Sequence, residues 1–146
     1  MNYRNLLSLE NQTFIVLGAG DGIGEQVSIA LSQWGGRVAC VDSSGERAQR
    51  VAAAVRGIAI VADVTRRDDM QRVFDETVQW SPNGPLGLVD VVGMVIPNRL
   101  GEVDDASWSR QFNVVLDHAW LALQLGARAM QGRGGSMVFI GSIAGQ

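Results

Sequence analysis

Three glycines that follow an apolar run are the residues best suited to bind a ligand. Residues Thr13–Leu17 are β-branched, aromatic and continuously apolar, as in a strand buried on both faces. Gly18, Gly22 and Gly24 come next, followed by an amphipathic helical pattern that reaches Trp34. A glycine-rich turn between a strand and a helix directs backbone N–H groups and the positive end of the helix dipole to one point. This loop is therefore predicted to bind a phosphate group.

The spacing of the glycines distinguishes between dinucleotide-binding loops. The common pattern G-x-G-x-x-G fits Gly18 and Gly20, but its third glycine would fall on Ile23. The pattern that fits is G-x-x-x-G-x-G, and it resembles the cofactor loop of the short-chain dehydrogenase/reductase family. A turn that binds nothing is the alternative. The resemblance implies a set of cofactor contacts in this loop: Gly18, Asp21, Gly22, Ile23 and Gly24.

A carboxylate ends the second apolar run, Arg37–Asp42. Asp42 lies where dinucleotide-binding folds place the acid that binds the adenosine ribose. It would accept hydrogen bonds from both ribose hydroxyls and repel a 2′-phosphate, and Ser43 and Ser44 offer no positive charge to receive one. These features predict NAD rather than NADP. The alternative is that Asp42 only caps the next helix, which Ser43 or Ser44 could do instead.

Two further segments are expected at the same site. The third apolar run, 58–62, is followed by Asp63 and Val64, which match an Asp-Val pair that holds the adenine in the family. The fourth run, 86–96, brings Val95 to the same edge of the sheet. Asp63 or Thr65 could instead cap the helix that follows.

Ser142 is the candidate catalytic residue. It follows the fifth apolar run, Ser136–Ile140, and its sequence context, Ser142 to Gly145, matches the serine motif of the family. The resemblance implies that Ser142 binds the reacting oxygen of a small alcohol or carbonyl substrate during hydride transfer. Because Gly-Ser-x-x-Gly is also a common turn sequence, a structural role is the alternative.

Hydride transfer also needs a group that donates or accepts a proton. The family uses a tyrosine and a lysine four residues later, shortly after the serine. Here Tyr3 is the one tyrosine, and all twelve basic residues are arginine. We therefore expect residues 1–146 to be an incomplete short-chain dehydrogenase fold without the acid–base pair. A sheet that ended at the fifth strand would also have an unprotected edge.

Three positions depart from the family pattern. Leu17 stands in place of a threonine before the first glycine. The Asn-Asn-Ala-Gly of the family is matched to Met94–Pro97, and its helix asparagine, part of a proton relay, falls on Val115, two positions from Asn113. The loss of polar groups favours an alternative function, a nucleotide-binding or interaction module without turnover.

A methyltransferase is a second alternative. Gly18, Gly20 and Gly22 also read as G-x-G-x-G, and an acid after the second strand could bind the ribose of S-adenosylmethionine. Against it, Val16 stands where that family has an acid, and the Ser142 motif has no explanation.

The alternation of five apolar runs with helical patterns predicts one Rossmann-type α/β domain over residues 1–146. Right-handed crossovers and a change of direction after the third strand predict a doubly wound parallel sheet of order 3-2-1-4-5, with helices on both faces. The net charge of −3 and the lack of a basic run make nucleic acid an unexpected partner. No apolar run suits a membrane, no metal site is expected, and the single Cys40 suits a cytoplasmic protein.

Residues 106–131 form the longest predicted helix, and they carry two apolar stripes. One face of a sheet can cover only one stripe, so the second one indicates another partner. The family resemblance implies that this partner is a second copy of the chain, which would make the protein a homo-oligomer.

Overall fold

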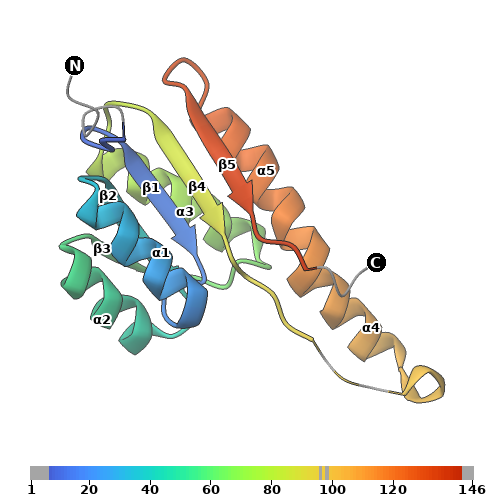
Figure 1. The fold of residues 1–146 in the computed structure, drawn as a ribbon. Coiled ribbons are helices and arrows are strands. Elements are labelled where there is room, and N and C mark those ends of the chain that lie inside the picture. Colours follow the sequence, from blue (N-terminus) through green and yellow to red (C-terminus); the bar gives the residue numbers. More distant parts are fainter. Residues whose placement is uncertain (1–6, 96, 98, 143–146) are drawn as a thin grey trace.

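β1 (Thr13–Leu17) lies at the centre of a five-stranded parallel sheet (Figure 1). The computed structural model describes residues 7–95, 97 and 99–142. The strand order is β3-β2-β1-β4-β5, as predicted from the sequence. The other strands are β2 (Arg37–Asp42), β3 (Ile58–Val61), β4 (Leu86–Asp90) and β5 (Gly135–Phe139).

Helices cover both faces of this sheet. α1 (Gly22–Gln33) and α2 (Gly45–Val55) lie on one face, and α3 (Arg67–Trp80) and α5 (His118–Ala129) lie on the other (Figure 1). All five residues of β1 are buried, so the sheet needs a layer of helices on each of its faces. Ile15 packs toward α3 and α5, and Val16 packs toward α1 and α2. Each fully buried side chain of this kind contributes about 1.5–3 kcal/mol.

Local signals in the sequence set the helix ends. α1 begins after Asp21 and α2 begins after Ser44, and both caps accept a hydrogen bond from a backbone N–H of the first turn. α2 is followed by the capping residue Arg56, whose φ of 53° is left-handed and lets the chain turn into β3. These ends place the carboxyl end of each strand next to the start of a helix.

The fourth strand is shorter than predicted. We expected it to run from 86 to 96, but β4 ends at Asp90, and residue 96 lies outside the described residues. The Asp90 carboxylate accepts a hydrogen bond from the N–H of Val92, which turns the chain away from the ladder. The N–H of Val91 still donates to the Leu17 carbonyl. The segment that follows β4 therefore begins at Val91, four residues before Val95.

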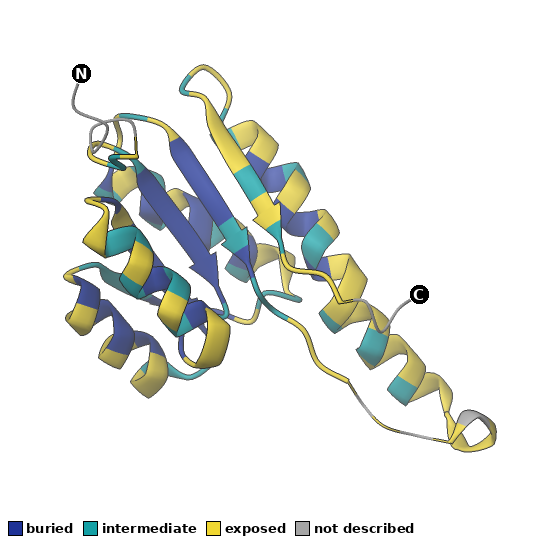
Figure 2. Cartoon of the chain, in the orientation of Figure 1, coloured by how far each residue is buried: buried dark blue, intermediate teal, exposed yellow. Residues whose placement is uncertain are grey.

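The predicted long helix is three connected pieces. α4 (Asp105–Phe112) passes into a π-helical turn, η3 (Asn113–Asp117), and then into α5. A short 3-10 turn, η2 (Leu100–Glu102), precedes α4. α4 extends beyond the carboxyl end of the sheet and has no buried residue (Figures 1 and 2). Among the described residues, no helix combines the length and the apolar character that a membrane crossing requires.

Candidate nucleotide-binding cleft

A cleft of about 870 Å³ opens at the carboxyl ends of β1 to β4. That volume lies in the range of small-molecule sites, and the carboxyl edge is where open α/β sheets bind ligands. Four of the residues proposed from the sequence line it together: Gly18, Asp42, Asp63 and Val64. The remaining walls come from residues 91–94 after β4 and from α4 and η3.

The three glycines of the loop have different structural roles. Gly24 is buried, and a Cβ there would overlap the carbonyl oxygen of Gly18, so this glycine lets α1 pack on the loop. Gly18 has a left-handed φ of 79° and lies against Val91 and Val92. Gly22 has a φ of 53°, and a Cβ there would meet no atom within 4 Å. Only Gly22 therefore leaves open space at the start of α1.

The first turn of α1 offers backbone donors toward this space. The Asp21 carboxylate accepts the N–H of Gly22 at 2.7 Å, so its structural role is to cap the helix. The N–H of Glu25 bonds to the Asp21 carbonyl. The N–H groups of Ile23 and Gly24 lie in the first turn of the helix, where no helical carbonyl is available four residues back. In the described part of the chain, neither N–H donates to an acceptor. These two donors and the helix dipole suit an anionic group.

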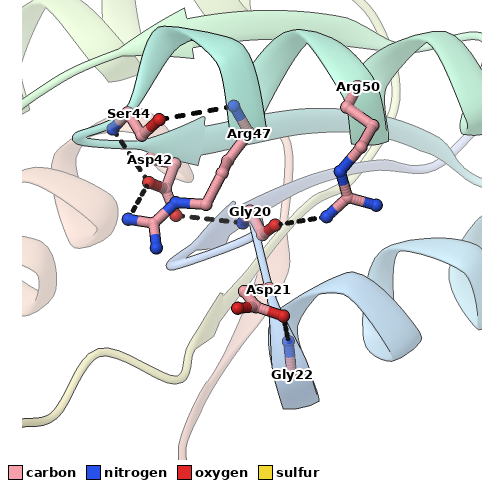
Figure 3. Close-up of polar contacts among 7 residues, drawn as sticks. All are labelled: Gly20, Asp21, Gly22, Asp42, Ser44, Arg47 and Arg50. Atoms are coloured by element: carbon pink, nitrogen blue, oxygen red, sulfur yellow. Dashed lines mark hydrogen bonds and ion pairs between the residues drawn. The ribbon is translucent and has the colours of Figure 1, made fainter.

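Asp42 is almost fully buried, and three donors surround its carboxylate (Figure 3). Oδ2 accepts the N–H of Gly20 at 3.0 Å, and Oδ1 accepts the N–H of Ser44 at 2.9 Å. Nη2 of Arg47 donates to Oδ1 at 2.9 Å. The cap of α2 is Ser44, whose hydroxyl accepts the N–H of Arg47. Asp42 is therefore not the cap of α2, and it joins the glycine loop to the start of that helix.

Arg50 fixes the loop from the opposite side. Its Nη2 donates to the carbonyl of Gly20 at 2.8 Å (Figure 3), and the guanidinium also pairs with Glu25 on α1. This pairing holds the pKa of the Glu25 carboxyl below its usual range, chiefly through the hydrogen bond from Arg50. The backbone of Gly20 is thus held at both of its polar groups, by Asp42 at the N–H and by Arg50 at the carbonyl.

Asp63 and Val64 follow β3 and line the cleft, as expected. The Asp63 carboxylate accepts the N–H and the hydroxyl of Thr65, at 3.0 and 2.7 Å, and forms a local turn. The N–H of Asp63 donates to the Asp69 carboxylate, a bond that lowers the pKa of Asp69. Asp63 does not cap α3, which begins after Arg66.

Asp90 and His118 form a buried pair beneath the cleft. Their side chains are each 2 % exposed, and Nε2 of His118 lies 3.0 Å from Oδ2 of Asp90. Asp90 is the last residue of β4 and His118 is the first of α5. The pair therefore joins two walls of the cleft, the segment from Val91 and the π-helical turn.

The other six predicted site residues lie outside the cleft lining: Asp21, Gly22, Ile23 and Gly24 at the start of α1, and Val95 and Ser142 elsewhere. Val95 is 83 % exposed, and Ser142 is exposed three residues beyond the end of β5. Residues 143–146, which complete the serine motif, lie outside the described residues. Val115, at the position of the family's asparagine, is half exposed, whereas Asn113 lines the cleft. The roles of Val95 and Ser142 stay predictions.

Sequence reasoning missed several residues at this site. Gly20 is not part of the glycine pattern that fits, but a Cβ there would overlap the Asp42 carboxylate. Arg47 is not adjacent to Asp42 in the sequence, and the two residues that directly follow Asp42 carry no charge. The first turn of α2 places Arg47 next to Asp42. A helix that begins directly after a strand is the sequence signal from which this contact could be predicted. Arg110 of α4 also lines the cleft.

Comparisons with known proteins identify the family. The family model for short chain dehydrogenases matches residues 12–146. Galactitol 2-dehydrogenase (L-tagatose-forming) from Cereibacter sphaeroides is 32 % identical over 149 residues, which cover 99 % of this chain and 58 % of that protein. (3R)-3-hydroxyacyl-CoA dehydrogenase from Mus musculus is 30 % identical over 154 residues, 96 % of this chain and 60 % of that protein.

A solved structure has the same fold. A short-chain type dehydrogenase/reductase from Mycobacterium marinum superposes with a TM-score of 0.91 at 27 % identity, covering 99 % of this chain and 61 % of that one. The chain belongs to the short-chain dehydrogenase/reductase family, a family of oxidoreductases. It spans about three fifths of the length of the relatives that it matches. Membership in this family removes the methyltransferase alternative.

Proposed function

We propose that the protein is an oxidoreductase that transfers hydride between NAD and a small alcohol or carbonyl compound. The observation that carries this proposal is the open space at Gly22, which lies at the start of α1 beside two backbone donors. When bound, NAD supplies the hydride acceptor and NADH the hydride donor. Family membership and the names of the relatives, which are dehydrogenases, support this class of reaction.

The residues of the cleft, together with the start of α1, fit a dinucleotide. Gly22, Ile23 and Gly24 would hold the pyrophosphate on backbone N–H groups and the helix dipole. The Asp42 carboxylate would accept the ribose hydroxyls, and its negative charge favours NAD over NADP. Asp63 and Val64 would hold the adenine, which suits their place in the cleft wall.

The substrate would bind at the carboxyl end of β5. Ser142 would orient its reacting oxygen, in keeping with the position of this serine after the strand. We assign no general acid or base among residues 7–95, 97 and 99–142. His118 does not suit the role, because its ring is buried against Asp90. Polyols are the first substrates to try, since a relative is a galactitol dehydrogenase.

The exposed apolar surface of α4, η3 and α5 supports self-association. Its large side chains are Trp108, Phe112, Val115, Leu116, Trp120 and Leu123, each at least 40 % exposed. We propose that a second copy of the chain covers this surface. A cytoplasmic location is proposed with it, on the cysteine usage of the sequence.

Binding of NADH to a Gly22→Ala variant tests the proposed function. The added methyl group would occupy the open space, so NADH affinity, measured by titration calorimetry, should fall at least about tenfold. Gly132→Ala is a matched control, because Gly132 also has a left-handed φ, of 78°, and open surroundings but follows α5 and is not part of the glycine loop. Both variants should lose about 1–2 kcal/mol of stability. Equal NADH affinity in the two variants would refute the loop assignment.

A further inference from the structure

One side of the cleft comes from a long segment that packs poorly against the sheet. The chain leaves the sheet after β4, runs out to α4 and returns to the sheet at α5 (Figure 1). Of the side chains that the structure describes from 91 to 117, none is buried. Residues 91–94 and parts of α4 and η3 nevertheless line the cleft. Burial alone therefore holds little of this side of the cleft in place.

The two residues that flank this segment are buried and paired with each other. Asp90 and His118 are 28 positions apart in the sequence, and both side chains are 2 % exposed. Nε2 of His118 lies 3.0 Å from Oδ2 and 3.2 Å from Oδ1 of Asp90. An ionised carboxylate only accepts hydrogen bonds, so Nε2 carries the proton. The other ring nitrogen, Nδ1, has no partner in the described part of the chain, and the contact with Asp90 therefore sets the orientation of the ring.

Each member of the pair also fixes a neighbouring part of the cleft. Asp90 accepts the N–H of Val92, and a Cβ on Gly18 would lie 3.2 Å from the Val92 side chain. The backbone N–H of His118 donates to the carbonyl of Asn113 and closes the π-helical turn that lines the cleft. Turns of this kind are frequent at functional sites. The pair thus links the π-helical turn to the glycine loop through the end of β4.

A second link lies at the outer part of the segment. Nε2 of Gln111 on α4 donates to the carbonyl of Met94 at 2.5 Å, at an exposed position. Water competes for a neutral hydrogen bond at the surface, whereas a bond to a buried carboxylate is charge-assisted and stronger. The inner pair, Asp90 and His118, is therefore the firmer attachment of the segment.

We propose that Asp90 and His118 are positioning residues for nucleotide binding, because their pair closes segment 91–117 at its base and holds that side of the cleft against the glycine loop. The inference rests on the proposed function. Neither residue lines the cleft, so neither is expected to touch the nucleotide. Bringing the ends of a long segment together costs conformational entropy. Without the pair, part of the binding free energy of the nucleotide would be spent on ordering the segment.

The first test breaks the pair and measures NADH affinity by titration calorimetry. His118→Leu should weaken NADH binding at least about tenfold, whereas His118→Gln, which keeps a donor for Asp90, should stay within about threefold. Leu125→Ala is the matched control, because it also removes buried atoms from α5 but leaves the pair intact. Its NADH affinity should change by less than about twofold. Thermal unfolding shows the temperature below which each variant is folded.

The second test separates positioning from stability. Asp90→Asn/His118→Leu removes the buried charge that His118→Leu would leave behind, and the asparagine oxygen can still accept the N–H of Val92. Its unfolding temperature should therefore lie above that of His118→Leu. Its NADH affinity should stay at least about tenfold below that of the unaltered protein. Without nucleotide, the amides of 91–94 and η3 should exchange hydrogen faster in both variants, by a larger factor than those of β1.

Distinct outcomes separate this inference from the proposed function. Failure of the unaltered protein to bind NADH would refute the proposed function, on which the inference rests. If the unaltered protein and His118→Leu bound NADH equally well, the positioning role would be overturned and the proposed function would stand. Recovery of NADH affinity in Asp90→Asn/His118→Leu would also overturn it, because the pair would then act on stability alone. That double variant decides the question even if His118→Leu fails to fold.

Discussion

The two halves of the chain bury their apolar residues to very different degrees. In the first half, every residue of β1 is buried, and α2 buries Ala48, Val51, Ala52 and Val55. In the second half, α4 buries none of its residues, and β5 has no buried position (Figure 2). Both halves are nevertheless rich in large apolar side chains.

The difference follows from the place of each half in the sheet. β1 and β2 have a strand on either side and helices on both faces, so their side chains are enclosed. β5 pairs only with β4 in the described part of the chain, and α5 covers one of its faces. Val138 and Ile140 are therefore about half exposed. The first half thus encloses its apolar residues, whereas the described part of the second half leaves large apolar side chains exposed.

The largest expected effect lies where the two halves meet, at the pair of Asp90 and His118. His118→Leu would remove the side-chain partner of the buried Asp90 carboxylate, which would keep only the N–H of Val92. The free energy of unfolding should fall by about 3–5 kcal/mol, measured by urea denaturation. His118→Gln, which keeps a donor, should lose less. If His118→Leu kept the stability of the unaltered protein, the pair would not be a junction between the halves.

A smaller effect is expected on the exposed surface of α5. Trp120 is 58 % exposed, so Trp120→Arg should leave the monomer stable to within about 0.5 kcal/mol. The same change would place a charge in the proposed apolar interface between copies, and sedimentation should then show a shift from oligomer to monomer. Trp34→Arg is the matched control, because Trp34 is 49 % exposed on the other side of the sheet. An unchanged oligomer in Trp120→Arg would exclude this surface as the interface.

The smallest expected effect is a difference in the reactivity of cysteine thiols between the two halves of the chain. Burial raises the pKa of the Cys40 thiol to about 11. At pH 8 the thiolate is then on the order of one part in a thousand, so Cys40 should react with a thiol reagent only on unfolding. A cysteine introduced by Val115→Cys, at a half-exposed position, should react at once in the monomer. Rapid labelling of Cys40 in the folded protein would contradict the enclosed core.

Much of the fold could be predicted because it rests on local patterns. The continuous apolar runs predicted five strands, and their order followed from right-handed crossovers. The end of β4 was not predicted. The run from Leu86 stays apolar past Asp90, and the hydrogen bond from Val92 to the Asp90 carboxylate ends the strand. The pattern of apolar residues in the sequence does not predict a side-chain hydrogen bond of this kind.

The candidate site was predicted in part for the same reason. Gly18, Asp42, Asp63 and Val64 stand at the carboxyl ends of strands or within three residues of them, so their order in the sequence brings them to one edge of the sheet. Contacts between separate elements were not visible in the sequence. The pairing of Asp90 with His118 joins residues 28 positions apart.

The sequence by itself determined the family, the parallel sheet and the edge at which a ligand would bind, since motif spacing and apolar periodicity are local properties. Tertiary structure alone decided the separate roles of Gly22 and Gly24, because only packing shows where a Cβ would meet open space or a backbone oxygen. It also decided that Arg47 lies against Asp42. A charge acts through distance in space, and distance in space depends on how a helix and a strand pack together.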